Sequence, residues 1–238
     1  MLEIKDLYKS YGQKQVLKGI NIKVDRGDIY GFIGKNGAGK TTTIKCIVGI
    51  NNFEKGKITI DGMDILENSL ECKKVTAYIP DNPELYEFMT GQKYLNFIAS
   101  VFELDYKLTK EKIDELAGIF DIEDALYEPI SSYSHGMKQK LAIISALIHK
   151  PKLLILDEPF VGLDPAATHY LKEEFKKMVK EGSAIFFSTH VLEVAQSLCN
   201  KVAIIKDGEI VISGYTKDVV SDSSLEDIFM ELINDKNR

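Results

Sequence analysis

Apolar and polar residues alternate with a period of two along residues 1–30, which is the pattern of half-buried strands. Turn residues separate the runs at Gly12-Gln13 and at 26–28, and a further strand at 58–60 ends in the hairpin dipeptide Asp61-Gly62. We therefore predict antiparallel strands in the N-terminal part of the chain. The apolar positions of the first two runs are Leu2, Ile4, Ile20, Ile22 and Val24.

Continuous apolar runs replace this alternation at 29–33 and 75–80, and again after residue 150. Strands with both faces apolar, separated by helices, are typical of a parallel sheet that is covered on both sides. The predicted helices begin at Asp164-Pro165 and at Val191, and a hairpin is expected at Asp207-Gly208. The later strands are expected at 153–156, 184–187 and 202–205.

The segment 83–150 is predicted to be mainly helical. Thr109 is expected to be the N-cap of a helix over 111–120, and Ser134 that of a helix over 137–148. Pro151 follows the second helix and prevents its continuation.

The composition of the chain argues against several classes of protein. The 238 residues are 45% hydrophobic, enough for one large domain, and the net charge of −6 argues against a nucleic-acid-binding surface. No apolar run approaches the ~20 residues of a membrane span. The charged N-terminus does not have a signal-peptide pattern. Cys46, Cys72 and Cys199 are expected to be reduced, packed thiols of a cytosolic protein rather than metal ligands or disulfides.

Residues 34–41 directly follow the apolar run 29–33 and match G-x-x-x-x-G-K-[ST]. In a strand–loop–helix setting, the small residues let backbone N–H groups surround phosphates, Lys40 reaches the β- and γ-phosphates, and Thr41 can ligate Mg²⁺. This phosphate-binding loop (P-loop) predicts binding of a nucleoside triphosphate. The residues predicted to bind ATP here are Gly34, Lys35, Asn36, Gly37, Ala38, Gly39, Lys40, Thr41 and Thr42.

The buried strand 153–156 ends in Asp157 and Glu158. Because parallel sheets bind ligands at the carboxyl ends of their strands, both carboxylates are expected to face the triphosphate. Asp157 would hold Mg²⁺, and Glu158 would orient and polarise the attacking water.

Together with residues 131–139, these motifs resemble the ATPase subunit of an ATP-binding-cassette (ABC) transporter, from Tyr11 to about Gly214. Residues 131–139 stand at the place of the family signature LSGGQ. Tyr133, His135 and Met137 depart from this pattern. The resemblance implies a head-to-tail dimer in which the signature of one subunit contacts ATP on the other. The signature residues in question are Ser134, His135, Gly136 and Met137.

The resemblance extends to four single positions. It implies that Tyr11 stacks on adenine, that Asp164 links the two ATP sites, and that His190 contacts the γ-phosphate. At the fourth position the family usually has a glutamine that touches Mg²⁺, whereas this chain has Asp81. We expect MgATP binding with altered hydrolysis or coupling, or a one-residue shift that gives the role to Asn82.

The resemblance implies an α/β fold of the P-loop NTPase (RecA-like) type over residues 1–238. A mostly parallel core with an N-terminal antiparallel β-subdomain is expected from 1–82 and 151–238. A helical subdomain with the signature is expected from 83–150.

The function implied is that of an ATP-hydrolysing subunit, with ATP and Mg²⁺, that drives a separate membrane permease. Export is favoured over import, because the signature and the tail at 224–229 resemble the multidrug/ABC-2 exporter-like subgroup. The permease would dock near 83–89 and hold the protein on the cytoplasmic face of the membrane. A second ATPase subunit, identical or different, would complete the dimer. The alternative is a soluble ABC-type ATPase that acts on ribosomes or DNA.

Overall fold

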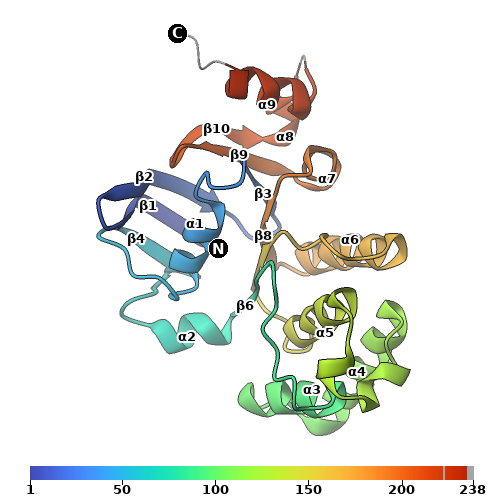
Figure 1. Ribbon diagram of the computed structural model, residues 1–238. Helices are drawn as coiled ribbons and strands as arrows, with labels where there is room; N and C mark the ends of the chain where they lie inside the picture. Colours follow the sequence, from blue (N-terminus) through green and yellow to red (C-terminus); the bar gives the residue numbers. More distant parts are fainter. Residues whose placement is uncertain (222, 235–238) are drawn as a thin grey trace.

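The alternating N-terminal strands form an antiparallel sheet of their own in the computed structural model, which describes residues 1–221 and 223–234 (Figure 1). The strand order of this four-stranded sheet is β2-β1-β4-β5. The prediction of antiparallel N-terminal strands is therefore confirmed, although it did not include β5. The strands are β1 (Leu2–Tyr11), β2 (Lys14–Val24), β4 (Lys55–Ile60) and β5 (Met63–Asp64).

The continuous apolar runs and the hairpin strand that follows Asp207-Gly208 form a second, six-stranded sheet in the order β10-β9-β3-β8-β7-β6. Neighbours from β9 to β6 are parallel, and β10 pairs antiparallel with β9. The predicted mostly parallel core is confirmed. Its strands are β3 (Ile29–Ile33), β6 (Thr76–Ile79), β7 (Leu153–Asp157), β8 (Ala184–Thr189), β9 (Lys201–Lys206) and β10 (Glu209–Tyr215).

Two tight turns have the backbone that their sequences predict. Asp61 and Gly62 have φ values of 51° and 83°, and Asp207 and Gly208 have 48° and 85°. Positive φ at both central residues is the type I′ conformation, which matches the twist of the flanking strands. The second turn contacts the P-loop, since Gly208 N donates to the carbonyl oxygen of Ala38.

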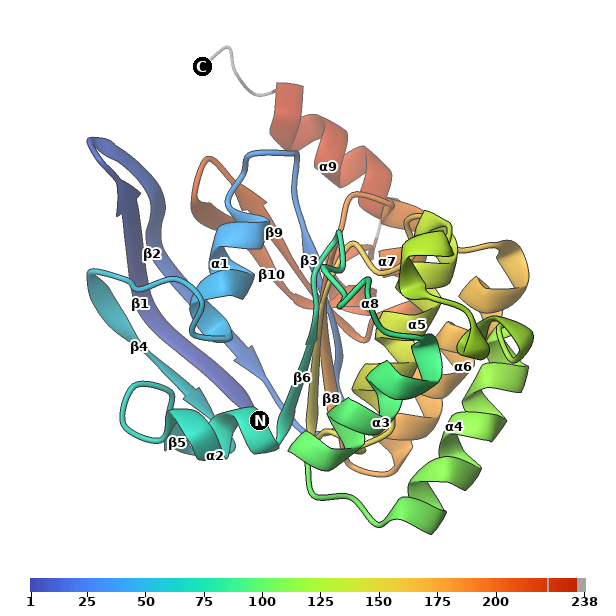
Figure 2. The same cartoon turned by 60° about the horizontal axis from the view of Figure 1, so that its bottom comes forward.

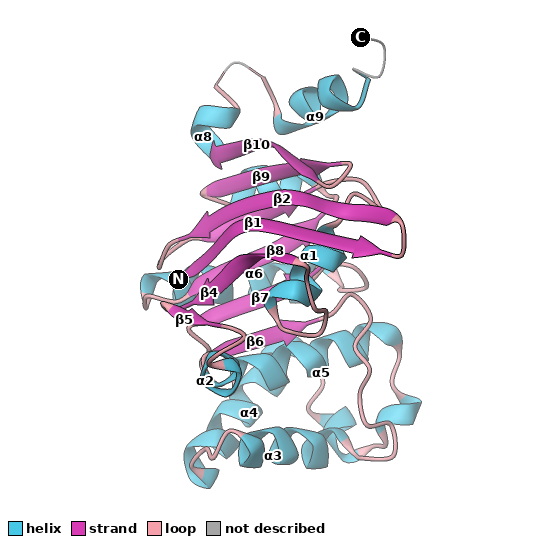
Figure 3. Ribbon diagram, turned by 90° about the vertical axis from the view of Figure 1, so that its left-hand side faces the viewer, coloured by secondary structure: helices cyan, strands magenta, loops and turns pink. Residues whose placement is uncertain are grey.

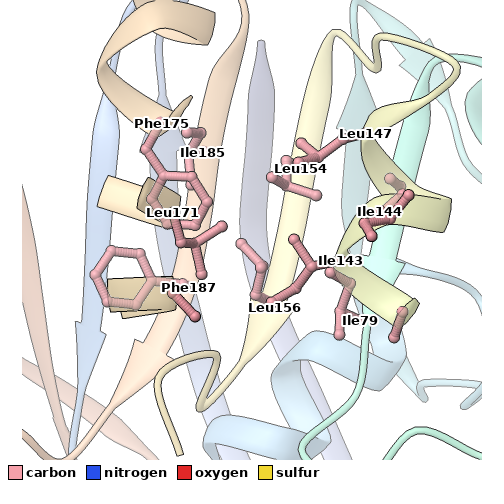
Figure 4. Close-up of a cluster of buried hydrophobic side chains, with 14 of the residues drawn as sticks. Ile79, Ile143, Ile144, Leu147, Leu154, Leu156, Leu171, Phe175, Ile185 and Phe187 are labelled. Carbon is pink, nitrogen blue, oxygen red and sulfur yellow. The ribbon is translucent and has the colours of Figure 1, made fainter. Parts of the chain in front are cut away.

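Both faces of the parallel sheet are buried, which explains its uninterrupted apolar strands. On one face, the helix α1 (Lys40–Ile47) lies between the two sheets (Figures 2 and 3). On the other face, side chains of β7 and β8 meet helices α5 and α6 (Figure 4). Examples are Leu154 beside Leu147, Leu156 beside Ile143, and Ile185 and Phe187 beside Phe175.

Helices account for most of residues 83–150, as predicted, and further helices lie outside this segment. The helices are α2 (Ser69–Lys74), α3 (Gly91–Val101), α4 (Tyr106–Phe120), η1 (Asp124–Tyr127), η2 (Ile130–Ser132), α5 (His135–Leu147), α6 (Pro165–Lys180), α7 (Leu192–Leu198), α8 (Thr216–Val219) and α9 (Leu225–Asn234). The short helix α2 was not predicted.

Two of the three predicted N-cap residues are confirmed and one is wrong. Ser134 and Asp164 are N-caps, accepting hydrogen bonds from Met137 N at 3.3 Å and Ala167 N at 2.8 Å. The prediction for Thr109 is wrong, because Asp105 caps α4 instead through a 2.9 Å bond from Leu108 N. Aspartate is a stronger cap than threonine, and the earlier start leaves Thr109 buried inside the helix.

The three cysteines are free and buried, as expected. Among residues 1–221 and 223–234, each helix is too short or too polar to cross a membrane.

Candidate functional site

The P-loop turns sharply between β3 and α1. Gly37 and Gly39 have φ values of 81° and 116°, which side chains with a Cβ rarely adopt. Gly34 has no room for a side chain, since a Cβ there would lie 2.7 Å from the carbonyl oxygen of Ile205. The backbone N–H groups of this loop and the N-terminal end of α1 are therefore held in the arrangement that binds phosphate.

A cleft of about 430 Å³ opens over the P-loop. It brings together residues from β1, β2, the P-loop, the segment after β6, and the end of β7. Its lining residues are Tyr11, Val16, Lys35, Asn36, Gly37, Gly39, Lys40, Thr41, Thr42, Asp81, Asp157 and Glu158. Most residues predicted for nucleotide and Mg²⁺ binding thus line one cavity, together with Val16, which was not predicted.

Lys40 lies on the floor of this cleft and is only 6% exposed. Its ammonium group donates a 2.6 Å hydrogen bond to the carbonyl oxygen of Gly34 and lies 3.4 Å from Glu158 Oε1. The cation is thus held between the P-loop and the end of β7. There it can meet the negative charge of a triphosphate at short range, where water screens little.

Asp157 and Glu158 are held in place by Ser188 on the neighbouring strand β8. The Ser188 hydroxyl donates to Asp157 Oδ1 and accepts a 3.1 Å hydrogen bond from the backbone N–H of Glu158. Glu158 has a φ of 50°, an unusual value for a residue with a side chain. Ser188 therefore orients the carboxylate of Asp157 and holds the backbone of Glu158.

His190 lies just beyond β8 and contacts Glu158 from the side opposite Lys40. Its Nδ1 atom is 2.9 Å from Glu158 Oε2, and its backbone N–H donates to the same oxygen at 3.3 Å. His190 is not among the lining residues of the cleft. The carboxylate of Glu158 is therefore positioned by two groups, one on each oxygen.

Asp81 reaches the cleft from the segment that follows β6, whereas Asn82 does not line it. Burial raises the pKa of Asp81, and the nearby carboxylates of Asp157 and Glu158 raise it further. This concentration of negative charge next to Thr41 favours a divalent cation. Among the described residues, His, Cys, Asp and Glu form no cluster of three or more that could hold a metal unaided. The oxygen atoms of Thr41, Asp81 and Asp157 are ligands of the kind that Mg²⁺ prefers.

Tyr11 stands at the rim of the cleft, where it is half exposed. Asn51 donates a 2.7 Å hydrogen bond to its hydroxyl group, and Lys9 lies 5.1 Å from the centre of its ring. The ring is thus fixed at the cleft entrance, and a flat nucleobase can stack on an aromatic surface held in this way.

The signature segment lies elsewhere in the same chain. Ser134, His135, Gly136 and Met137 do not line the cleft, and they form the start of α5. Gly162, in the loop before α6, packs on this start: a Cβ on Gly136 would lie 2.7 Å from the Gly162 carbonyl oxygen. The loop is tied to α5 by an ion pair of 2.7 Å between Asp164 and Lys140. The structure therefore joins Asp164 to the signature helix and leaves the signature outside the lining of the cleft.

Tyr133 occupies the first position of the signature, where the family pattern LSGGQ has leucine. Its side chain is buried, and its hydroxyl donates to the carbonyl oxygen of Ala125. Space for this hydroxyl exists because residue 91 is glycine: a Cβ there would lie 2.4 Å from the Tyr133 oxygen. Gly91 and Tyr133 together set the position of the chain that leads into Ser134.

Gly91→Ala is therefore expected to destabilise the protein by about 1–3 kcal/mol, because the new methyl group overpacks this site. Chemical denaturation of the variant measures the effect. Gly91→Ala/Tyr133→Phe is the matched control, since it removes the oxygen that the methyl group strikes. The double variant should lose less than the sum of the two single losses. Strictly additive losses would contradict the packing argument.

Similarity to known proteins shows to which family this chain belongs. A family model described as ABC transporter matches residues 17–161, more than half of the chain. The chain belongs to the ABC transporter family. Among similar proteins is the ABC-type transporter ATP-binding protein EcsA of Bacillus subtilis, 34% identical over 98% of this chain and 96% of its own length.

A second relative and one solved structure agree with this assignment. The linearmycin resistance ATP-binding protein LnrL of Bacillus subtilis is 33% identical, over 93% of this chain and 71% of its own length. A structure described as the ATP binding subunit of an ABC transporter matches with a TM-score of 0.94 at 35% identity. It covers 98% of this chain and 100% of that one. The predicted family and the α/β P-loop ATPase fold are confirmed.

Besides Val16, two contacts that hold the ABC site were missed from the sequence. Ser188 reaches Asp157 and the backbone of Glu158 only because β7 and β8 are neighbours in the sheet, although α6 separates these strands along the chain. Gly162 meets the start of α5 across the fold. The signal that could have found Ser188 is its place at the carboxyl end of an apolar strand, two residues before His190.

Proposed function

We propose that this ABC protein binds MgATP in the cleft over the P-loop and hydrolyses it to power transport by a separate permease. The observation that carries the proposal is the convergence of Lys40, Glu158 and His190 beside the P-loop. A cation for the phosphates, a carboxylate for the attacking water and a third group that orients this carboxylate are the parts that phosphoryl transfer to water requires.

Each group has a distinct part in this mechanism. The P-loop N–H groups and Lys40 bind the phosphates, and Tyr11 receives the adenine. Glu158 aligns the attacking water and accepts its proton, and His190 holds Glu158 before it meets the γ-phosphate. Bound Mg²⁺, held by Thr41 and by Asp157 or Asp81, would neutralise charge on the β- and γ-phosphates. Most of the rate enhancement then comes from positioning and charge stabilisation.

The position of the signature supports a head-to-tail dimer. Ser134 caps α5, so its hydroxyl, the Gly136 N–H and the positive end of the helix can face an anion. Because this end does not line the cleft of its own chain, we infer that it completes the ATP site of a second ATPase subunit. That subunit is a copy of this chain or a related one. Asp164, joined to the signature helix by Lys140, then links the two sites.

A permease that docks near 83–89 is supported by an exposed aromatic cluster. Phe88 is 82% exposed, and the ring of Tyr86 lies 5.9 Å from that of Phe88 and 5.7 Å from that of Phe97 on α3. Exposed apolar side chains that gather in this way mark interaction surfaces. Docking here would place the protein on the cytoplasmic face of the membrane. We favour export, and the name of the resistance protein LnrL is in keeping with it.

The docking segment is also joined to the signature. Ile130 N donates to the carbonyl oxygen of Met89 at 2.9 Å, and Ser131 N donates to that of Glu87 at 3.1 Å. The Glu87 side chain also pairs with Lys138 on α5. A displacement of this segment by a permease would therefore be passed directly to the chain that carries Ser134.

The experiment that tests this function is affinity purification of the tagged chain from membranes of its own cell, with mass spectrometry of the proteins that come with it. We expect a protein with several hydrophobic spans. Ribosomal proteins or DNA without a permease would instead favour the alternative, a soluble ABC-type ATPase.

Asp81→Gln tests the departure at the Mg²⁺ site. Because the carboxylate attracts Mg²⁺ more strongly than an amide does, the variant should need several-fold more Mg²⁺ for half-maximal ATP turnover and should hydrolyse at a different rate. Turnover measured against Mg²⁺ concentration gives both values. Asn82→Gln is the control, since Asn82 does not line the cleft. A Mg²⁺ dependence and rate equal to those of the wild type would reject a role for Asp81.

A further inference from the structure

The helix α9 lies near the P-loop, which connects β3 to α1 (Figure 2). A cavity of about 160 Å³ separates them, lined by residues 35–38 of the P-loop, residues 204–207 at the end of β9, and Phe229 and Leu232 of α9. The ends of α9 are attached to α7, which follows His190, and to β9, which leads to the turn beside the P-loop.

The first end of α9 is fixed to α7, the helix that follows His190. Asp227 N donates to Ser224 Oγ and Ser224 N donates to Asp227 Oδ2, both at 3.1 Å, which is a reciprocal cap. Leu225 is fully buried, and its N–H donates to Gln196 Oε1 of α7 at 2.8 Å. The N-terminal end of α9 is thus capped and attached to α7.

The second end of α9 is fixed to β9. The ammonium group of Lys206 donates to the carbonyl oxygen of Leu232. The last turn of α9 contains no basic residue of its own, so Lys206 supplies the positive charge that a helix C-terminus favours. A helix of this length is marginal in water by itself, and its position therefore depends on these two attachments and on the packing of its apolar side chains against the core.

Lys206 is followed by the turn Asp207-Gly208, which is in direct contact with the P-loop. Gly208 N donates to the carbonyl oxygen of Ala38 at 3.1 Å, and Gly208 O accepts from Lys18 N of β2 at 2.9 Å. A Cβ on Gly208 would lie 2.2 Å from the carbonyl oxygen of Val16, so the turn packs tightly against Val16, which lines the cleft. A shift of the turn would move both the P-loop and Val16.

We propose that α9 positions the P-loop for ATP, and that Lys206 is the positioning residue that connects α9 to the P-loop through the β9–β10 turn. The proposal rests on ATP binding in the cleft. Release of α9 opens the cavity behind residues 35–38 and leaves the turn without its outer support. The backbone N–H groups of the P-loop then lose part of their preorganisation, which weakens binding without changing the groups that act on the attacking water.

The test compares Lys206→Met and Lys206→Arg with the wild-type full chain. For Lys206→Met, we expect the Kd and the KM for MgATP to rise about three- to tenfold, with kcat within about twofold of wild type. Lys206→Arg should restore most of the affinity. Hydrogen exchange should show faster exchange in α9 of Lys206→Met. Lys112→Met, which removes a lysine paired with Glu115 on α4, is the matched control and should leave the Kd unchanged.

An unchanged Kd in Lys206→Met overturns the proposal, whether or not α9 exchanges faster. Loss of affinity in Lys206→Arg equal to that in Lys206→Met also overturns it. If Lys206→Met does not fold, Gln196→Met at the other attachment is measured in the same way, with a smaller rise of the Kd expected. A wild-type chain that fails to bind MgATP would reject the proposed ATP site itself, which is a separate result.

Discussion

Glu158→Gln is expected to bind MgATP with an affinity near that of the wild type and to hydrolyse it at least about 100-fold more slowly. The amide keeps the size of the side chain and can still contact Lys40 and His190, but it cannot accept a proton from the attacking water. With binding intact and hydrolysis blocked, the ATP-bound dimer should accumulate. Phosphate release measures the rate, and sedimentation with MgATP measures the mass.

Glu173→Gln is the matched control, because Glu173 pairs with Lys176 on the surface of α6 and lies outside the cleft. It should hydrolyse ATP at the wild-type rate. Hydrolysis by Glu158→Gln within a few-fold of the wild type would show that another group activates the water. No change of mass with MgATP would count against the closed dimer.

Lys40→Met is expected to lower the affinity for MgATP about 10- to 100-fold, which corresponds to the loss of a hydrogen bond between charged groups. The methionine fills the space of the buried lysine stem, so the effect comes from the lost charge rather than from a cavity. Titration with a fluorescent ATP analogue measures the Kd.

Lys45→Met controls for the loss of a lysine from the same helix, α1, at a position that does not line the cleft. Its Kd should remain that of the wild type. If Lys40→Met bound MgATP as tightly as the wild type, the cleft over the P-loop would not be the triphosphate site.

Features that depend on neighbouring residues in the chain could be predicted from the sequence. The P-loop, the apolar strands, and the turns at Asp61-Gly62 and Asp207-Gly208 each follow from local patterns. The one wrong cap, Thr109, arose because two capping residues stand four positions apart, and the pattern alone did not show that Asp105 would be used.

Features that depend on the fold could not be predicted in this way. Ser188 reaches Asp157 only through the order of strands in the sheet, and Gly91 makes room for Tyr133 from another helix. The attachment of α9 to Lys206 also joins residues that no local pattern relates. Such contacts follow from packing between elements, which decides how the predicted residues are held.

The measurement that tests the central claim most directly is ATP hydrolysis by a mixture of two defective chains. Lys40→Met lacks a working P-loop, and Ser134→Asp places a negative charge where the partner's γ-phosphate would lie while keeping a good N-cap. Each variant alone should be inactive. In a head-to-tail dimer, random pairing restores one intact site in each mixed pair, so the mixture should regain roughly a quarter of the wild-type turnover. A mixture that remains as inactive as its components would contradict the shared ATP site.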